Sequence, residues 1–204
     1  MEFPWHASRS AFTDAAAWFV RTAALVGDRW GEPGLGEWDV RALVGHTSRS
    51  FLTVETYLDR PAATVEVSSA ADYFRTTRAA ARGPAVAARG REAGAALGRH
   101  PAEAVATIAE RVVRLLDIRN GTELVTTIAG GMRLRDYLPT RTFELAVHTA
   151  DLATALDESP DVPDTAASQA LCLVTELAVR DGLAGTLLLG ATGRTGLPSR
   201  FSVL

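Results

Sequence analysis

The sequence predicts a mainly helical protein, a bundle of helices followed by a small appendage of one helix and a pair of strands. Three observations support this prediction. Apolar residues recur at helical spacing in most of the longer segments, as in residues 102–118. Gly and Pro residues that form turns separate these segments, and the β-prone stretches are short. We therefore expect a helical bundle over residues 1–160 and the appendage over residues 161–204.

The composition is that of an ordinary globular protein and argues against several classes of function. Hydrophobic residues make up 47% of the chain and charged residues 22%, as in most water-soluble domains. The net charge of −3 does not favour a nucleic-acid partner. No apolar run approaches the roughly 20 residues of a membrane-spanning helix. All 21 basic residues are Arg, so no lysine is available for Schiff-base chemistry.

The cellular setting follows from the single cysteine and the first residues. Cys172 has no second cysteine in the chain with which to form a disulfide, which fits a reducing compartment. The N-terminus lacks the basic region and apolar core of a signal peptide. We expect a cytoplasmic protein that is a monomer or a homodimer and that has neither a membrane nor a nucleic acid as partner.

Two helices are expected in the first sixty residues. Residues 7–28 carry apolar side chains at helical spacing, and the turn formers of residues 31–36 end this pattern. Asp39 is a plausible N-cap for a second helix, which should run to about Asp59. Residues 61–69 then predict a loop that opens with a proline.

The middle of the chain predicts two further helical regions. Residues 70–97 are rich in Ala and Arg, and the pair Gly83-Pro84 should interrupt them. We expect their Ala and Arg face to be solvated rather than to form a binding surface. Pro101 suits the first turn of the next helix, which extends over residues 102–118.

The last eighty residues begin with a change of pattern. Residues 123–134 combine β-prone residues with a Gly-Gly turn and predict a short hairpin or an extended loop. Helices are expected at about residues 138–156 and 165–180, each with apolar residues at helical spacing. Residues 186–190 resemble a strand and could pair with residues 200–204 as a C-terminal hairpin.

Ionisable residues follow one face of the helix expected at residues 138–156. Tyr137, Arg141, Glu144, His148 and Asp151 recur three or four residues apart, so they lie above one another on the helix. Helical bundles build metal and cofactor sites from such inward-facing side chains. A Glu and a His four residues apart also occur by chance as a surface pair, so this stripe alone does not establish a site.

A second histidine lies almost a hundred residues upstream, on the second expected helix. His46 shares a helix face with Ser50, Thr53 and Tyr57, and Trp38 precedes it by eight residues. A single histidine in such a place is more often a core or surface residue than a ligand. Its significance depends on whether the fold brings it to the stripe.

Taken together, the two segments resemble a known family. The pattern Trp-x-x-x-x-Leu-Val-x-His at residues 38–46 and Arg-x-x-Glu-x-x-x-His-x-x-Asp-Leu at residues 141–152 are similar to motifs of the mycothiol-dependent maleylpyruvate isomerase family. A Gly-Gly-Met turn before residues 134–138 adds to the likeness. This is an actinobacterial group of DinB-like metalloenzymes with a four-helix bundle. The resemblance covers residues 7–156, and the C-terminal region is shortened.

The resemblance implies a ligand set and a cosubstrate. A divalent metal, typically zinc, would be held by His46, Glu144 and His148, and mycothiol would serve as the thiol. Two imidazoles and one carboxylate leave a position open on zinc, where a thiol can be held as its thiolate. Arg141 and Asp151 are then catalytic candidates that orient the substrate or the ligands. Alternatively, each forms only an intrahelical ion pair or a cap contact.

Three functions remain open at this point. The first is a metal-dependent thiol enzyme, for S-transfer or isomerisation, whose partners are a small-molecule thiol and an electrophilic substrate. The second is a metal-dependent hydrolase that uses metal-bound water, with Asp151 as general base. The third is a non-catalytic bundle that binds a metal or another small ligand.

Overall fold

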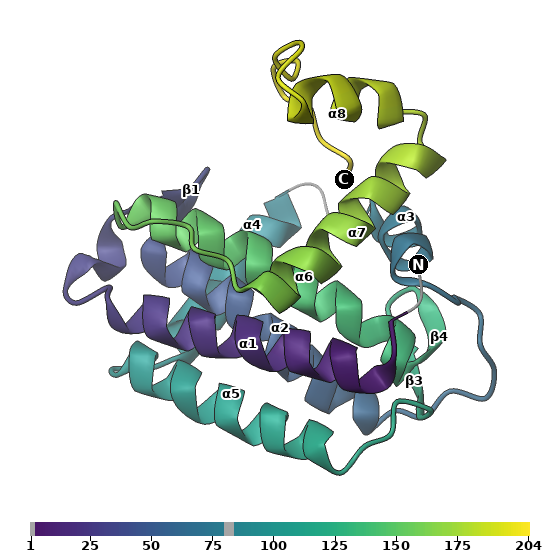
Figure 1. Ribbon diagram of the computed structural model, residues 1–204. Coiled ribbons are helices and arrows are strands. Elements are labelled where there is room, and N and C mark those ends of the chain that lie inside the picture. Colours follow the sequence, from purple (N-terminus) through teal and green to yellow (C-terminus); the bar gives the residue numbers. More distant parts are fainter. Residues whose placement is uncertain (1–2, 80–83) are drawn as a thin grey trace.

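The computed structural model describes residues 3–79 and 84–204, which fold mainly into helices joined by short connections (Figure 1). Two small antiparallel sheets, β1-β2 and β3-β4, flank the helices. In chain order the elements are α1 Trp5–Ala24, the 3-10 helix η1 Arg29–Gly31, β1 Pro33–Leu35, β2 Trp38–Asp39, α2 Val40–Leu58, α3 Ala70–Thr77, α4 Pro84–Ala96, α5 Pro101–Asp117, β3 Leu124–Thr127, β4 Gly130–Arg133, α6 Leu134–Ala155, α7 Asp164–Arg180 and α8 Ala184–Ala191.

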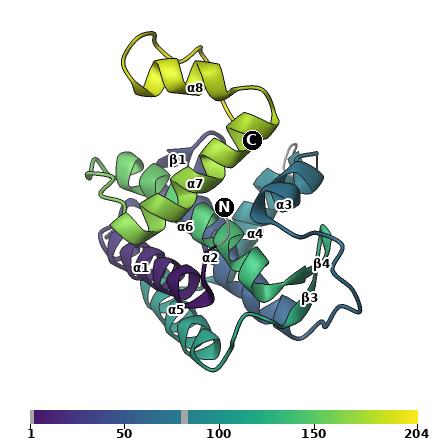
Figure 2. The same cartoon turned by 45° about the vertical axis from the view of Figure 1, so that its right-hand side comes forward.

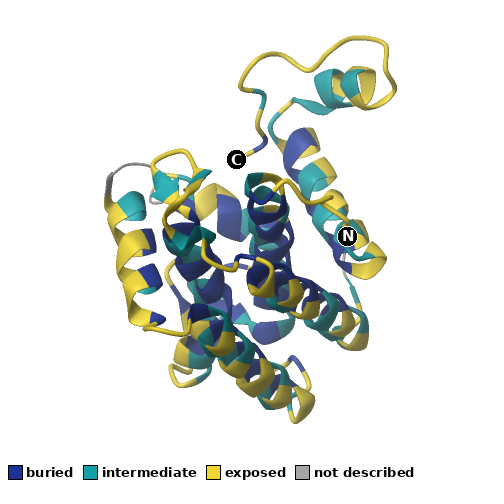
Figure 3. Ribbon diagram, turned by 90° about the vertical axis from the view of Figure 1, so that its left-hand side faces the viewer, coloured by how far each residue is buried: buried dark blue, intermediate teal, exposed yellow. Residues whose placement is uncertain are grey.

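Four of the long helices, α1, α2, α5 and α6, form the bundle (Figures 1 and 2). Both α1 and α2 pack against α5 and α6. Figure 3 shows the buried residues gathered where the helices face one another. The largest fully buried side chains include Phe12, Phe19, Leu43, Phe51, Leu116, Tyr137, Leu145 and Leu152. These side chains belong to one hydrophobic cluster, and burial of each stabilises the fold by about 1.5–3 kcal/mol.

The start of α2 is set by a cap and a hairpin. The carboxylate of Asp39 accepts a hydrogen bond from the backbone N–H of Ala42, with Oδ1 and N 2.7 Å apart. This is the N-cap geometry that the sequence predicts. The preceding strands β1 and β2 pair through Pro33 with Asp39 and Leu35 with Trp38. The hairpin therefore places the side chain of Trp38 beside the first turns of α2.

Helix α4 lies against α2 at a distance that only glycine permits. A Cβ atom built on Gly45 would lie 2.1 Å from the backbone N of Gly94, and one on Gly94 would lie 2.6 Å from the carbonyl oxygen of Arg41. Gly90 and Gly94 are buried on this face of α4, whereas Arg89 and Arg91 are exposed, as expected for the Ala and Arg face. The sequence predicts an interruption at Gly83-Pro84. Gly83 lies outside the described residues, and α4 begins at Pro84.

Helix α6 begins at Leu134, four residues earlier than the sequence pattern predicts. The expected hairpin precedes it directly as β3 and β4. The loop before the hairpin satisfies the first N–H groups of α6: those of Leu134 and Arg135 donate to the carbonyl oxygens of Glu123 and Gly121. Leu134 is fully buried. Because packing and these bonds stabilise the first turn, Pro139 is accommodated inside the helix rather than at its start.

The expected C-terminal hairpin is wrong: residues 186–190 lie in helix α8. Unbranched leucines flanked by Ala have good helix propensity, and residues 200–204 do not form a partner strand. The preceding helix α7 packs against α1, α3 and α6, while α8 packs against α7 and has no buried residue (Figures 2 and 3). The predicted domain boundary at residue 160 stays a prediction.

Within residues 3–79 and 84–204, none of the helices combines the length and hydropathy required to cross a bilayer.

Candidate metal centre

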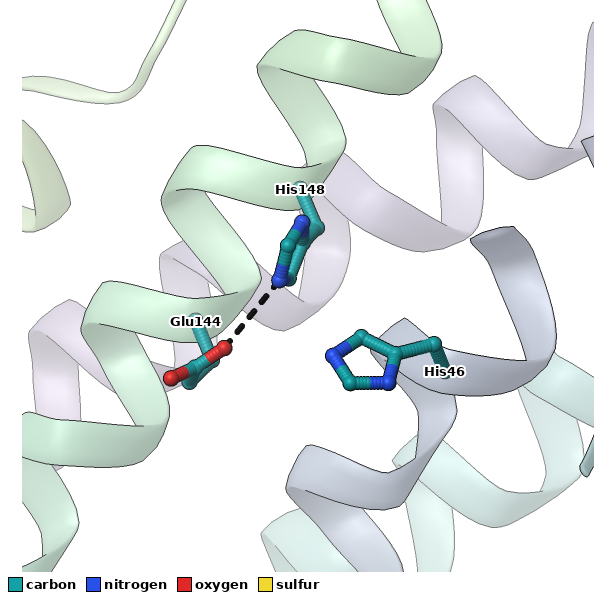
Figure 4. A group of neighbouring side chains, drawn as sticks. All are labelled: His46, Glu144 and His148. Atoms are coloured by element: carbon teal, nitrogen blue, oxygen red, sulfur yellow. Dashed lines mark ion pairs between the residues drawn. The ribbon is translucent and has the colours of Figure 1, made fainter. Parts of the chain in front are cut away.

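Two helices bring one histidine from α2 together with a glutamate and a histidine from α6. His46, Glu144 and His148 each offer one potential ligand atom, and these atoms lie within 4.8 Å of one another. Figure 4 shows a ring nitrogen of His46 directed toward the Glu144–His148 pair. The structure thus joins residues that are almost a hundred positions apart in sequence. This group of three residues could bind a metal ion.

On α6, His148 is held between two carboxylates. Its Nε2 lies 3.1 Å from Oε2 of Glu144, and its Nδ1 lies 3.1 Å from Oδ2 of Asp151. Spacings of four and three residues on a helix produce these contacts. Burial lowers the pKa of His148, but the hydrogen bonds to Asp151 and Glu144 outweigh it and raise the pKa to about 9. Without a metal, His148 is therefore an imidazolium that bridges two anions near pH 7.

Glu144 remains ionised in this environment. Burial raises the pKa of its carboxyl group, yet the hydrogen bond from His148 and the charge of Arg141 lower it to about 2. Its side chain keeps partial exposure. The carboxylate is thus already in the charge state that a metal ion requires of its ligands.

His46 differs from His148 because it is neutral. Burial, followed by repulsion from His148, lowers its pKa to about 4. Its imidazole lies against the indole of Trp38, with ring centroids 4.4 Å apart. Among the described residues, its buried Nδ1 atom has no hydrogen-bond partner. The neutral imidazole of His46 therefore points at a carboxylate and a second imidazole while one of its own nitrogens stays unbonded in the described chain. This arrangement is better explained by metal binding than by a hydrogen-bond network, in which buried polar atoms are normally paired.

These residues fit a divalent metal of the zinc type. Two imidazole nitrogens and one carboxylate oxygen are ligands that zinc accepts, and three protein ligands leave room for a fourth from solution. Asp151 occupies the place of the carboxylate that commonly orients a metal-binding histidine, because it contacts the Nδ1 atom of His148. All three candidate ligands are partly exposed, so the group can be reached from outside.

The two predicted catalytic residues lie at opposite ends of the group on α6. Asp151 makes an intrahelical contact, as the simpler alternative predicts. Its partner, however, is the candidate ligand His148, so the contact also fits a role in orienting that ligand. Arg141 is buried and forms no ion pair with any carboxylate in the described part of the chain; its guanidinium lies over the rings of Tyr73 and Tyr137. The alternative of a simple intrahelical ion pair therefore does not describe Arg141. The catalytic roles of both residues stay predictions.

The sequence reasoning missed two residues near the group, Tyr73 and Arg49. Tyr73 lies on the short helix α3, and only tertiary packing brings it over Arg141, so no spacing in the sequence signals it. Arg49 lies three residues after His46 on α2, and its charge contributes to lowering the pKa of His46. This helical spacing is the signal that could have identified Arg49.

Comparison with known proteins supports the resemblance of the two motifs. The family model described as the mycothiol maleylpyruvate isomerase N-terminal domain matches residues 9–153. Comparisons with curated proteins and with solved structures found no match. The matched segment covers more than half of the chain and includes α2 and most of α6, and these helices carry His46, Glu144 and His148. The chain therefore belongs to the family of the mycothiol maleylpyruvate isomerase N-terminal domain.

Proposed function

We propose that this protein is a metal-dependent thiol enzyme that uses a low-molecular-weight thiol, mycothiol, for S-transfer or isomerisation of an electrophilic substrate. The observation that carries the proposal is the convergence of His46, Glu144 and His148 within the segment that matches the family model. When bound by these residues, a divalent metal such as Zn²⁺ supplies a Lewis acid that can hold a thiol as its thiolate at neutral pH.

His46, Glu144 and His148 would each contribute differently to binding such an ion. His46 contributes a neutral imidazole without prior loss of a proton, because its pKa is about 4. Glu144 contributes the negative charge. His148 must give up its proton, and Asp151, in contact with Nδ1, keeps the ring oriented while it does so.

The contact of Asp151 with His148 also favours the thiol enzyme over the hydrolase. A hydrolase of this kind needs a general base that is free to take a proton from water. Asp151 is engaged with the Nδ1 atom of His148 at 3.1 Å and is therefore better placed to orient that ring. A thiol with a lowered pKa needs no such base, since its proton can leave to solvent.

Substitution of Co²⁺ for the resident metal tests the proposal without an activity assay. Mycothiol added to the Co²⁺-loaded protein should produce the near-ultraviolet absorption of a cobalt–thiolate bond, whereas S-methyl mycothiol should not. The methylated compound is a matched control because it keeps the sugar portion and loses only the ionisable S–H. Stoichiometric cobalt binding with no thiolate band would contradict the thiol enzyme and leave a metal-binding bundle or a hydrolase.

A further inference from the structure

Helix α8 is apolar on all sides and yet lies outside the core. Residues 182–193, which include this helix, contain no charged residue, and three leucines follow one another at residues 187–189. Helices that are apolar all round are normally buried. Here Leu188 is 65% exposed, Leu189 is 45% exposed, and no residue of α8 is buried. Such exposure is typical of a surface that packs against a partner.

The segment that carries α8 is held at both of its ends by one arginine. We call residues 182–202 the arm: it leaves the end of α7 and returns to the bundle at Val203, which is buried (Figure 1). Nη2 of Arg78, at the end of α3, donates to the carboxylate of Asp181 and, at 3.1 Å, to the carbonyl oxygen of Val203. The arm is therefore fixed to the bundle at its base and presents its apolar helix in a defined position.

The side of α7 that faces away from the bundle continues this apolar surface. The opposite side of the helix is buried against α1, α3 and α6. On the outer face, Leu171, Thr175 and Val179 recur at helical spacing, and the two apolar residues among them are 61% and 67% exposed. Six of the twelve exposed large hydrophobic residues in the described chain lie within residues 171–204. Exposed apolar area is thus concentrated at this end of the protein.

Charges of opposite sign lie at the two ends of this surface. Residues 157–164, which lead into α7, include four acidic residues and no basic one, whereas the arm carries Arg194 and Arg200 and no acidic residue. All six charged residues are exposed, and none of them forms an ion pair within the described part of the chain. The 17 residues of α7 separate the acidic end from the arm by roughly 25 Å (Figure 1). The two groups of charges therefore cannot neutralise each other within one molecule.

A second copy of the chain fits both the apolar surface and the charges. When two α7 helices pack antiparallel through their outer faces, the start of each helix lies beside the end of the other. The arm of one copy then lies next to the acidic residues of its partner, and uncharged residues meet between them. The arm and the outer face together are of the size that each partner contributes to a standard interface, roughly 20–30 residues.

We propose that the outer face of α7 and the arm form the interface of a two-fold symmetric homodimer with antiparallel α7 helices at its centre. Arg194 and Arg200 of each copy lie against the acidic residues 157–164 of the other, and Leu171 and Leu188 lose their contact with water. An apolar centre with charges at its rim is the usual composition of such interfaces. The proposal does not depend on the metal centre, because neither α7 nor the arm carries a candidate ligand.

Sedimentation equilibrium of the full chain over a range of concentrations tests the interface. Wild type should reach a mass of about twice the 21.7 kDa of one chain. Leu171→Glu and Leu188→Glu should each weaken the dimer at least about tenfold, because a carboxylate would be buried in an apolar contact. Ile128→Glu is the matched control, since Ile128 is 67% exposed in the turn between β3 and β4, outside the proposed interface. This control should dimerise as wild type does.

Charge reversal tests the antiparallel arrangement. Arg194→Glu combined with Arg200→Glu makes the arm acidic, and Glu158→Arg combined with Asp161→Arg makes the start of the surface basic. Each double variant alone places like charges across the interface and should dimerise at least about tenfold more weakly than wild type. A mixture of the two variants brings opposite charges together at both contacts and should form a heterodimer with nearly wild-type affinity. Circular dichroism confirms that each variant is folded.

The outcomes decide between this interface and its alternatives. A wild type that stays monomeric at every concentration would overturn the proposal and leave the surface to another kind of partner. A dimer that Leu171→Glu and Leu188→Glu leave intact, or that Ile128→Glu weakens equally, would overturn the choice of surface. A mixture of the charge variants that associates no better than either variant alone would overturn the antiparallel arrangement. Assemblies that keep growing with concentration would contradict a closed two-fold dimer.

Discussion

The indole of Trp38 lies against the imidazole of His46, with ring centroids 4.4 Å apart and planes inclined by 33°. Trp38 is itself held by α4, because its Nε1 donates to the carbonyl oxygen of Ala87 at 3.1 Å. Gly90 of the same helix makes room for it: a Cβ atom there would lie 2.6 Å from Nε1 of Trp38. Since the Nδ1 atom of His46 has no hydrogen-bond partner among the described residues, this stack positions the imidazole.

Trp38→Phe should therefore weaken metal binding while leaving the bundle folded. The smaller ring loses the hydrogen bond to Ala87 and covers less of His46, and loss of such ligand support typically costs about 10- to 100-fold in affinity. Zinc affinity is measured against a competing chelator. Trp30→Phe is the matched control, since Trp30 packs over Arg41 rather than over a candidate ligand. Equal zinc affinity in Trp38→Phe and wild type would contradict the positioning role.

Asp151→Asn should reduce metal affinity by a similar factor. The variant keeps an oxygen near Nδ1 of His148 but loses the charge that orients the ring and raises its pKa. The fold should persist, because the side chain of Asp151 is 30% exposed. The same competition assay measures the effect. The control is Asp161→Asn, which removes an exposed carboxylate that accepts a hydrogen bond from Ser159 and should leave metal affinity at the wild-type value. An equal loss of affinity in both variants would indicate a general charge effect and contradict the orienting role of Asp151.

Gly45→Ala should destabilise the protein by about 1–3 kcal/mol, because the new methyl group would collide with the backbone of α4. Chemical denaturation followed by circular dichroism measures the change. Gly185→Ala is the control: nothing lies within 4 Å of a Cβ at Gly185, and alanine favours the helix. We expect unchanged or slightly higher stability for this control. Similar stability of Gly45→Ala and wild type would show that α2 and α4 can separate without cost.

Stability should also depend on ion pairs between the C-terminal ends of α3 and α7. Asp181 accepts a hydrogen bond from Arg78 and lies 3.3 Å from Nε of Arg75, and these contacts lower its pKa below the ordinary value of 3.8. A lowered folded-state pKa means that the stabilisation is present above pH 3.8 and is lost as the pH falls through the folded value. Asp181→Asn should therefore be less stable than wild type at pH 7, and the difference should shrink toward pH 3. A constant difference would contradict this assignment.

The bundle and its candidate ligands could be predicted from the sequence because both depend on local periodicity. Spacings of three and four residues are sufficient to place Glu144, His148 and Asp151 on one face of α6. The capping residue Asp39 marks the start of α2. The motif resemblance then pairs His46 with Glu144 and His148, a pairing across helices that periodicity alone does not establish.

The features that sequence reasoning missed depend on tertiary packing. A short leucine run is compatible with a helix or a strand, and in the described part of the chain no strand lies beside residues 186–190, which form a helix. The packing of Arg141 over the ring of Tyr73 requires α3 to contact α6, which no local pattern encodes. The close contact of α2 with α4 could not be predicted from the sequence either. A glycine inside a helical pattern indicates a helix break as readily as a closely packed pair of helices.

The most direct test of the metal centre is the metal content of the purified protein. Wild type, His46→Ala and Glu144→Ala are reconstituted with Zn²⁺, dialysed without a strong chelator and measured by elemental analysis, with circular dichroism to confirm folding. We predict about one equivalent of divalent metal in wild type and little in either variant, since α2 and α6 each contribute to one site. Folded wild type without metal, or full metal content in either folded variant, would contradict the metal centre.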